Sequence, residues 1–107
     1  MTVSTHVLDA ALGRPAAGVP VRLDGPDGSF AVDAVTDADG RVAQLARTPL
    51  EPGEYRLRFD TGAYFAASGR DAFYPEVVVT FHIADPAQHY HVPLLLSPFA
   101  YSTYRGS

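Results

Sequence analysis

Hydrophobic and polar residues alternate in short runs along most of this 107-residue chain. The plainest run spans residues 54–60, where Tyr55, Leu57 and Phe59 alternate with Arg56 and Arg58. A period of two is typical of a strand that buries one face and exposes the other. We therefore predict that the three apolar side chains lie in the core and the two arginines face solvent.

Seven further runs read as strands, and turns rich in Gly, Pro and Asp separate them. The eight predicted strands span residues 3–8, 19–23, 30–36, 41–45, 54–60, 76–83, 89–96 and 100–105. Residues 47–53 form a proline-containing connection. Many short strands with such turns indicate an all-β fold, a two-sheet β-sandwich. The pattern shows no internal repeat or linker, so residues 1–107 are predicted to form one domain.

One stretch has helical spacing, residues 61–69. Thr61 is a plausible N-cap because its hydroxyl can accept a hydrogen bond from the first turn. Gly69 is a natural helix terminator, since glycine adopts the left-handed conformation that often ends a helix. We predict one short helix here.

The C-terminal residues 89–107 contain two strand-like runs that meet at a Ser-Pro turn. Alternation places His89, His91 and Pro93 on one face of the first run and only apolar bulk on the other. A hairpin of this kind can place His91 and Tyr104 side by side. Pro93 lacks the N–H that a strand ladder uses, so a local irregularity is expected there.

Composition narrows the classes of partner. The net charge is −4 with a pI near 5.3, and the eight basic residues are scattered, which argues against a nucleic-acid surface. The absence of cysteine excludes disulfides and thiolate metal sites and suits a reducing cytoplasm. No signal-peptide pattern opens the sequence and no apolar run approaches the roughly 20 residues that span a bilayer. The sequence predicts a cytoplasmic protein with small-molecule or protein partners.

Familiar catalytic and metal motifs are missing. The sequence has no Gly-x-Ser-x-Gly and no His-Glu-x-x-His, so a covalent mechanism is not indicated. Asp-Ala-Asp-Gly at 37–40 resembles the start of a calcium loop but lacks the later ligands, and reads as an ordinary turn. His89 and His91 have same-face spacing that could suit a metal, yet no third ligand is identified. No metal or cofactor is predicted.

Histidine is the remaining candidate for chemistry, at His6, His82, His89 and His91. His82 has nothing that distinguishes it from a surface residue. His6 and His91 become interesting only if the strand over 3–8 lies beside the strand over 89–96, and spacing alone does not establish that pairing.

Three motifs carry a resemblance to a known family. The C-terminal stretch reads His-Tyr-His-Val-Pro-Leu-Leu-Leu-Ser-Pro and ends in Tyr-Arg-Gly-Ser, residues 4–9 read Ser-Thr-His-Val-Leu-Asp, and residues 36–41 read Thr-Asp-Ala-Asp-Gly-Arg. Together they resemble the 5-hydroxyisourate hydrolase branch of the transthyretin-like family. The resemblance runs over essentially the whole chain.

The resemblance implies a transthyretin-like sandwich in which the first strand lies beside the C-terminal hairpin. It also implies a homotetramer, a dimer of dimers, whose sheets line a central channel. On the family pattern His6, Arg41 and His91 are catalytic, while His6, Arg41, Tyr104 and Ser107 bind substrate. Ser107 could contribute its hydroxyl or its α-carboxylate. The implied reaction is cofactor-free hydrolysis of 5-hydroxyisourate to 2-oxo-4-hydroxy-4-carboxy-5-ureidoimidazoline in urate degradation.

These residue types suit such a hydrolysis. A histidine with a pKa near 6.5 can deprotonate water and protonate a leaving nitrogen at neutral pH. An arginine offers a planar fork of donors to an anion or a developing oxyanion. Which histidine is the base stays open.

Two other classes stay open. A transthyretin-type carrier would use the same channel to bind a small aromatic ligand, and on the resemblance such carriers lack the paired histidines, the arginine and the Tyr-Arg-Gly-Ser ending. A β-sandwich adhesion or accessory module is the third.

Overall fold

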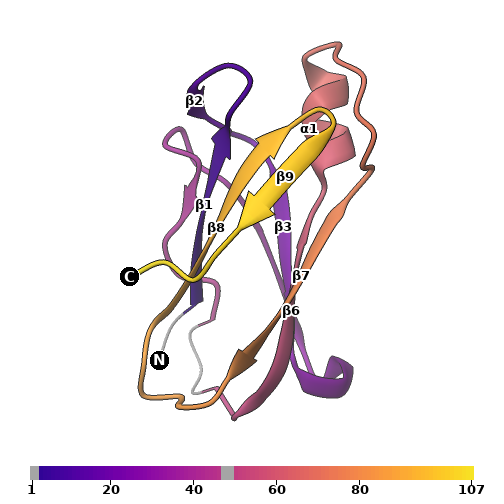
Figure 1. Ribbon diagram of the computed structural model, residues 1–107. Coiled ribbons are helices and arrows are strands. Elements are labelled where there is room, and N and C mark those ends of the chain that lie inside the picture. Colours follow the sequence, from indigo (N-terminus) through magenta and orange to yellow (C-terminus); the bar gives the residue numbers. More distant parts are fainter. Residues whose placement is uncertain (1–2, 47–49) are drawn as a thin grey trace.

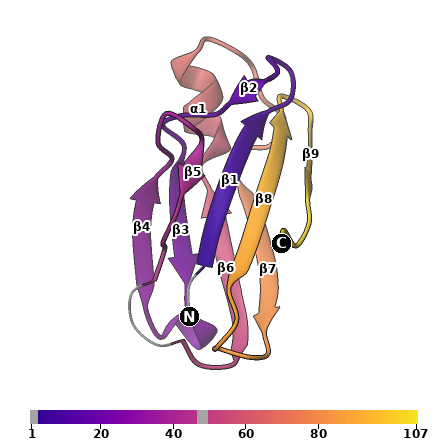
Figure 2. The same cartoon turned by 90° about the vertical axis from the view of Figure 1, so that its left-hand side faces the viewer.

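The computed structural model describes residues 3–46 and 50–107, which form nine strands and one α-helix in two sheets packed face to face (Figures 1 and 2). One sheet has the order β2-β1-β8-β9, with β5 also paired to β1, and the other has the order β4-β3-β6-β7. The first sheet comprises β1 (Val3–Asp9), β2 (Arg14–Pro15), β5 (Arg41–Val42), β8 (Tyr90–Ser97) and β9 (Ala100–Thr103). The second comprises β3 (Pro20–Asp24), β4 (Ala31–Val35), β6 (Gly53–Phe59) and β7 (Val77–Ile83). The predicted all-β sandwich is confirmed.

Most predicted strands are present with ends shifted by no more than two residues. The strand predicted over 41–45 is shorter, because only Arg41–Val42 pairs with β1. The two-residue β2 was not predicted, and a 3-10 turn (Pro26–Gly28) follows β3. Of the predicted connection over 47–53, residues 47–49 lie outside the described residues and residue 53 already belongs to β6.

The core lies between the sheets and is built from the alternating strand positions. Tyr55, Leu57 and Phe59 of β6 are completely buried, as predicted. Across the interface they meet the inward side of the other sheet, which includes Val7 and Leu94, both also completely buried. Removing these side chains from water is the main favourable contribution to folding.

The helix α1 (Thr61–Ala67) connects β6 to the segment that leads into β7. Its N-cap is Asp60, whose carboxylate accepts a hydrogen bond from the Ala63 N–H at 3.1 Å. The prediction that Thr61 caps the helix is therefore wrong by one residue: Thr61 is buried and its hydroxyl donates to the Tyr74 carbonyl at 3.1 Å. Gly69 follows the helix with a φ of 69°, which agrees with its predicted role as terminator.

A parallel pairing places β1, near the start of the chain, beside β8, near its end (Figure 2). Ser4 lies opposite His91, and His6 lies opposite Pro93. The Thr5 hydroxyl donates to the Val92 carbonyl at 2.6 Å inside the core and reinforces the register. This is the pairing on which the importance of His6 and His91 depends.

Pro93 interrupts the ladder between β8 and the C-terminal tail. Pairing runs from Ser97–Ala100 to Leu94–Thr103, stops, and resumes only as a single bridge between His91 and Gly106. Proline has no N–H for the intervening bond, and its carbonyl instead accepts from the Thr103 hydroxyl at 2.6 Å. The expected irregularity is present as this gap.

A buried ion pair fastens the end of β1 to the helical segment. The Asp9 carboxylate is fully buried and accepts hydrogen bonds from Arg70 Nη2 and Tyr64 Oη, both at 2.7 Å, and from the Leu12 N–H at 3.0 Å. Burial alone would raise the pKa of Asp9, but these donors outweigh it and leave that pKa below its ordinary value. Asp9 therefore stays charged and holds β1 in place. Within the described residues, no helix is long and apolar enough to cross a membrane.

Candidate active site

Arg41 is positioned by the tight turn at residues 37–40. The Asp37 carboxylate accepts hydrogen bonds from the N–H groups of Asp39 and Arg41, each at 2.9 Å. Gly40 adopts a φ of 74°, and its carbonyl accepts from the Val7 N–H at 2.7 Å. A Cβ on Gly40 would overlap the Val7 carbonyl oxygen, so only glycine lets the turn lie this close to β1.

The turn delivers Arg41 directly opposite His6 in the antiparallel pairing of β5 with β1. Residues opposite one another in neighbouring strands share a face of the sheet. By the same reasoning Ser4 and His91 share that face, because they are partners in the β1–β8 register. Two histidines, an arginine and a serine thus gather on the outer face of the first sheet.

A hollow of about 290 Å³ lies on this face. We name it the histidine hollow; it is lined by Ser4, Thr5, Arg41, Val42, Ala43, His89, His91 and Ser107. His6 is half-buried and is not part of the lining, but it adjoins the hollow as the strand partner of Arg41. The hollow therefore contains two of the three predicted catalytic residues, with the third at its border.

The surroundings of His91 shift its pKa. Its Nδ1 lies 2.7 Å from the Ser4 hydroxyl, and the same hydroxyl lies 2.8 Å from Nε2 of His89. Burial lowers the pKa of His91, and the positive charges of Arg41, His89 and His6 lower it further. The His91 imidazole is therefore held neutral around pH 7.

The C-terminal tail lies against His91. The Gly106 N–H donates to the His91 carbonyl at 2.8 Å, and a Cβ on Gly106 would come within 2.5 Å of His91 Cδ2. Arg105 donates a 3.1 Å hydrogen bond to the Gln88 side chain. Its guanidinium also makes a cation–π contact with Tyr90, 4.5 Å from the centre of the ring. These contacts carry Ser107 to the edge of the histidine hollow.

Tyr104 does not line the histidine hollow. The tail register places Gly106 opposite His91, so Tyr104 falls opposite Pro93. Tyr104 is 59% exposed and lines a separate hollow of about 270 Å³ with Phe81, His82 and other residues of β7, β8 and the tail. Within one subunit, Ser107 lines the histidine hollow and Tyr104 lines a different one.

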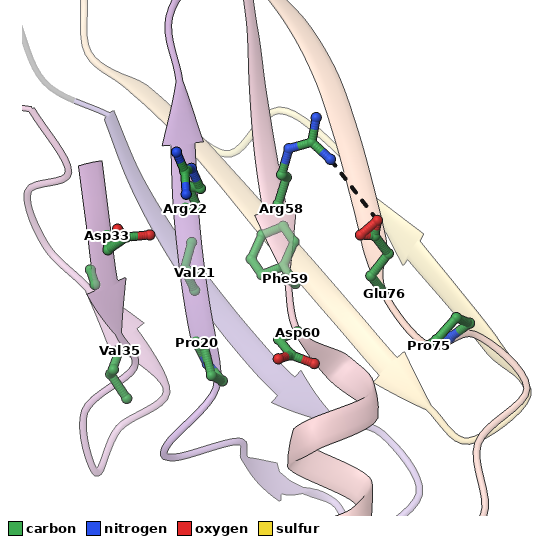
Figure 3. Close-up of a pocket in the computed structure, with 11 residues that line it drawn as sticks. Pro20, Val21, Arg22, Asp33, Val35, Arg58, Phe59, Asp60, Pro75 and Glu76 are labelled. Carbon is green, nitrogen blue, oxygen red and sulfur yellow. Dashed lines mark ion pairs between the residues drawn. The ribbon is translucent and has the colours of Figure 1, made fainter. Parts of the chain in front are cut away.

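A further hollow, of about 750 Å³, lies on the other sheet (Figure 3). It is open, and its two arginines are paired with acidic neighbours: Arg58 lies 2.7 Å from Asp24 and 4.0 Å from Glu76, and Arg22 lies 3.2 Å from Asp24. Volume alone does not make this hollow a site.

Comparison with known proteins identifies the family. The model of the HIUase/Transthyretin family matches residues 3–106. The chain belongs to the HIUase/transthyretin family. Its curated relatives include the 5-hydroxyisourate hydrolase of Caulobacter vibrioides, which is 47% identical over 98% of this chain and 97% of that protein.

The similar solved structures include both a 5-hydroxyisourate hydrolase and a transthyretin in complex with thyroxine. The Klebsiella pneumoniae 5-hydroxyisourate hydrolase superposes with a TM-score of 0.91, is 43% identical and covers all of both chains. Sea bream transthyretin in complex with thyroxine also gives a TM-score of 0.91, at 33% identity over 99% of this chain and 95% of that one. The fold is therefore shared by both classes, and the side chains of the site must distinguish them.

Prediction from the sequence missed one residue at the site, Ser4, and placed His89 on the face of His91 without giving it a role there. Ser4 alternates with His6 along β1, so the same-face rule could have found it. His82 is exposed and lies in the Tyr104 hollow, away from the other histidines. In the part of the chain that the structure describes, no group of three or more His, Asp or Glu side chains could hold a metal ion.

Proposed function

We propose that this protein hydrolyses 5-hydroxyisourate to 2-oxo-4-hydroxy-4-carboxy-5-ureidoimidazoline. One observation carries the proposal: Arg41, His6 and His91 share one face of a sheet around the histidine hollow. The names of the curated relatives from Caulobacter vibrioides and Mus musculus, at 47% and 44% identity, support it.

The proposed reaction adds water to a ring carbonyl carbon and breaks the adjoining C–N bond, which yields a carboxylate and an N–H. His91 and His6 activate the water and return its proton to the leaving nitrogen. Neutral His91 is suited to accept that proton, because its lowered pKa keeps its lone pair available at pH 7. No cofactor is assigned, since water and proton transfers account for every atom.

Arg41 holds the anionic substrate and stabilises the oxyanion. It lines the hollow and is exposed on the face that carries both histidines, and a guanidinium presents donors that match planar anions. Preorganised donors of this kind are worth about 3 to 4 kcal/mol in the barrier. Ser107 provides a polar contact at the rim, and Tyr104 a hydroxyl contact to substrate.

We further propose that the working form is a cytoplasmic homotetramer, a dimer of dimers, with residues 1–107 as one domain. The support is an exposed apolar surface: Phe73, Phe99 and Tyr101 are 68%, 69% and 41% exposed in the isolated subunit. A partner subunit would cover such side chains. It could also bring Tyr104 to the site from a neighbouring copy.

The alternative is a non-catalytic carrier of a small aromatic ligand, favoured by the similarity to sea bream transthyretin in complex with thyroxine. A carrier needs a hollow but no neutral imidazole beside an arginine. The two candidates therefore differ in one measurable property, acceleration of a reaction.

The test generates 5-hydroxyisourate in place with urate oxidase and follows its ultraviolet absorbance with and without this protein. We expect decay well above the spontaneous rate, and a loss of about 10²-fold or more in kcat for His6→Asn and Arg41→Gln. Arg22→Gln, on the opposite sheet, is the matched control and should keep wild-type activity. Decay at the spontaneous rate from folded wild-type protein would favour the carrier.

A further inference from the structure

The Ser4 hydroxyl bridges two imidazoles, and this bridge restricts their protonation. It lies 2.7 Å from His91 Nδ1 and 2.8 Å from His89 Nε2. Ser4 is only 7% exposed, so its hydroxyl depends on these two partners. A hydroxyl has one proton to donate, so with both rings neutral it donates to one nitrogen and accepts an N–H from the other.

Two arrangements satisfy this rule. In the first, Ser4 donates to His89 and accepts from His91 Nδ1–H, which leaves His91 Nε2 with a lone pair. In the second, the directions reverse and His91 Nε2 carries the proton. Only the first makes His91 a base at the nitrogen that is left for substrate.

Arg41 favours the first arrangement. It lines the same hollow as His91, and its positive charge acts on the His91 ring. An Nε2–H directed into that hollow would be repelled by the Arg41 guanidinium, whereas an Nε2 lone pair would be attracted to it.

We propose that Ser4 and His89 are positioning residues that hold His91 in the tautomer with an unprotonated Nε2, ready to take a proton from water. This rests on the proposed hydrolase function. When His91 takes the proton, its Nδ1–H still donates to Ser4, so the hydrogen bond that selects the base also stabilises the imidazolium. An outer partner of a ring nitrogen fixes tautomer and orientation in the same way at many sites.

The chain supplies matched variants for the bridge. Ser4→Ala removes the hydroxyl, whereas Ser4→Thr keeps it. His89→Leu removes the acceptor, whereas His89→Gln offers an amide oxygen in its place. We expect Ser4→Ala and His89→Leu to lower kcat by about 10- to 100-fold with little change in KM. Ser4→Thr and His89→Gln should stay within a few-fold of wild type.

A second readout separates this inference from the hydrolase assignment. ¹⁵N NMR of the imidazoles above the His91 pKa should show unprotonated Nε2 in the wild type and a mixture of tautomers in Ser4→Ala. A protonated wild-type Nε2, or Ser4→Ala with wild-type kcat, would overturn the role of the bridge. If even wild-type protein leaves 5-hydroxyisourate decay unchanged, the hydrolase proposal fails, while the NMR result still decides the tautomer.

Discussion

At the scale of single residues, the environment of His91 determines what it can do. Burial comes first among the causes that lower its pKa, and the charges of Arg41, His89 and His6 follow. The folded pKa lies below the unfolded value of about 6.5, so the unfolded chain binds more protons. The contribution of His91 therefore lowers the free energy of unfolding as the pH falls from about 6.5 toward its folded pKa. In the folded protein its imidazole stays neutral, and able to act as a base, somewhat below about pH 6.5.

The effect of the Arg41 charge on the His91 pKa predicts the result of Arg41→Gln. Loss of the guanidinium removes one cause of the shift, so the pKa of His91 should rise toward its ordinary value. An NMR titration of the His91 imidazole measures the change directly. Arg22→Gln, on the other sheet, should leave that pKa where it is. An unchanged His91 pKa in Arg41→Gln would show that the guanidinium does not act on the ring.

At the scale of elements, the turn at residues 37–40 connects fold to site. It is held by the Asp37 carboxylate and by the bond from Val7 to the Gly40 carbonyl, and it presents Arg41 to β1. Gly40 is needed both for its φ of 74° and for its close approach to Val7. Substitution there should disturb stability and activity together.

Gly40→Ala can be compared with Gly69→Ala. Both positions have positive φ, but an added Cβ at Gly69 meets no atom within 4 Å. We expect Gly69→Ala to lose about 1 kcal/mol of unfolding free energy, with activity unchanged. Gly40→Ala should lose about 2 to 3 kcal/mol and at least about 10-fold in kcat/KM, because the overlap with Val7 displaces Arg41. Urea unfolding measures the loss of stability and the hydrolase assay measures the loss of activity. Equal losses in the two variants would show that the close approach of Gly40 to Val7 has no role.

At the scale of the whole molecule, the exposed aromatic side chains predict association. Tyr74 packs against Phe73 and Tyr101 with ring centres 4.9 and 5.2 Å apart, and Phe99 is more exposed than any of these. Light scattering at micromolar concentration should give about 46 kDa, four times the 11.5 kDa subunit. Phe99→Asp should lower that mass. Val35→Asp, a 60% exposed site on the other sheet, should not. A wild-type mass of one subunit would contradict the tetramer.

Local pattern was enough for most of the fold. Alternation located Tyr55, Leu57 and Phe59 in the core, because a strand with one buried face must repeat every second residue. It was weaker where pairing decides the element: residues 43–45 leave β5 because only Arg41 and Val42 pair with β1. Asp60 caps the helix in place of Thr61, because Thr61 is buried and its hydroxyl donates to the Tyr74 carbonyl.

By itself, the sequence determined the strands, their buried faces and the chemical types available at the site, since these depend on neighbours along the chain. Local pattern could not decide that β1 lies beside β8, because that contact spans more than 80 residues; the family resemblance implied the pairing, and the tertiary structure establishes it. That pairing makes Ser4 a bridge between two histidines. The separate pairing of β5 with β1 brings Arg41 beside His6. The register of β8 with the C-terminal tail places Gly106, and not Tyr104, opposite His91, because a strand register sets which residues face one another.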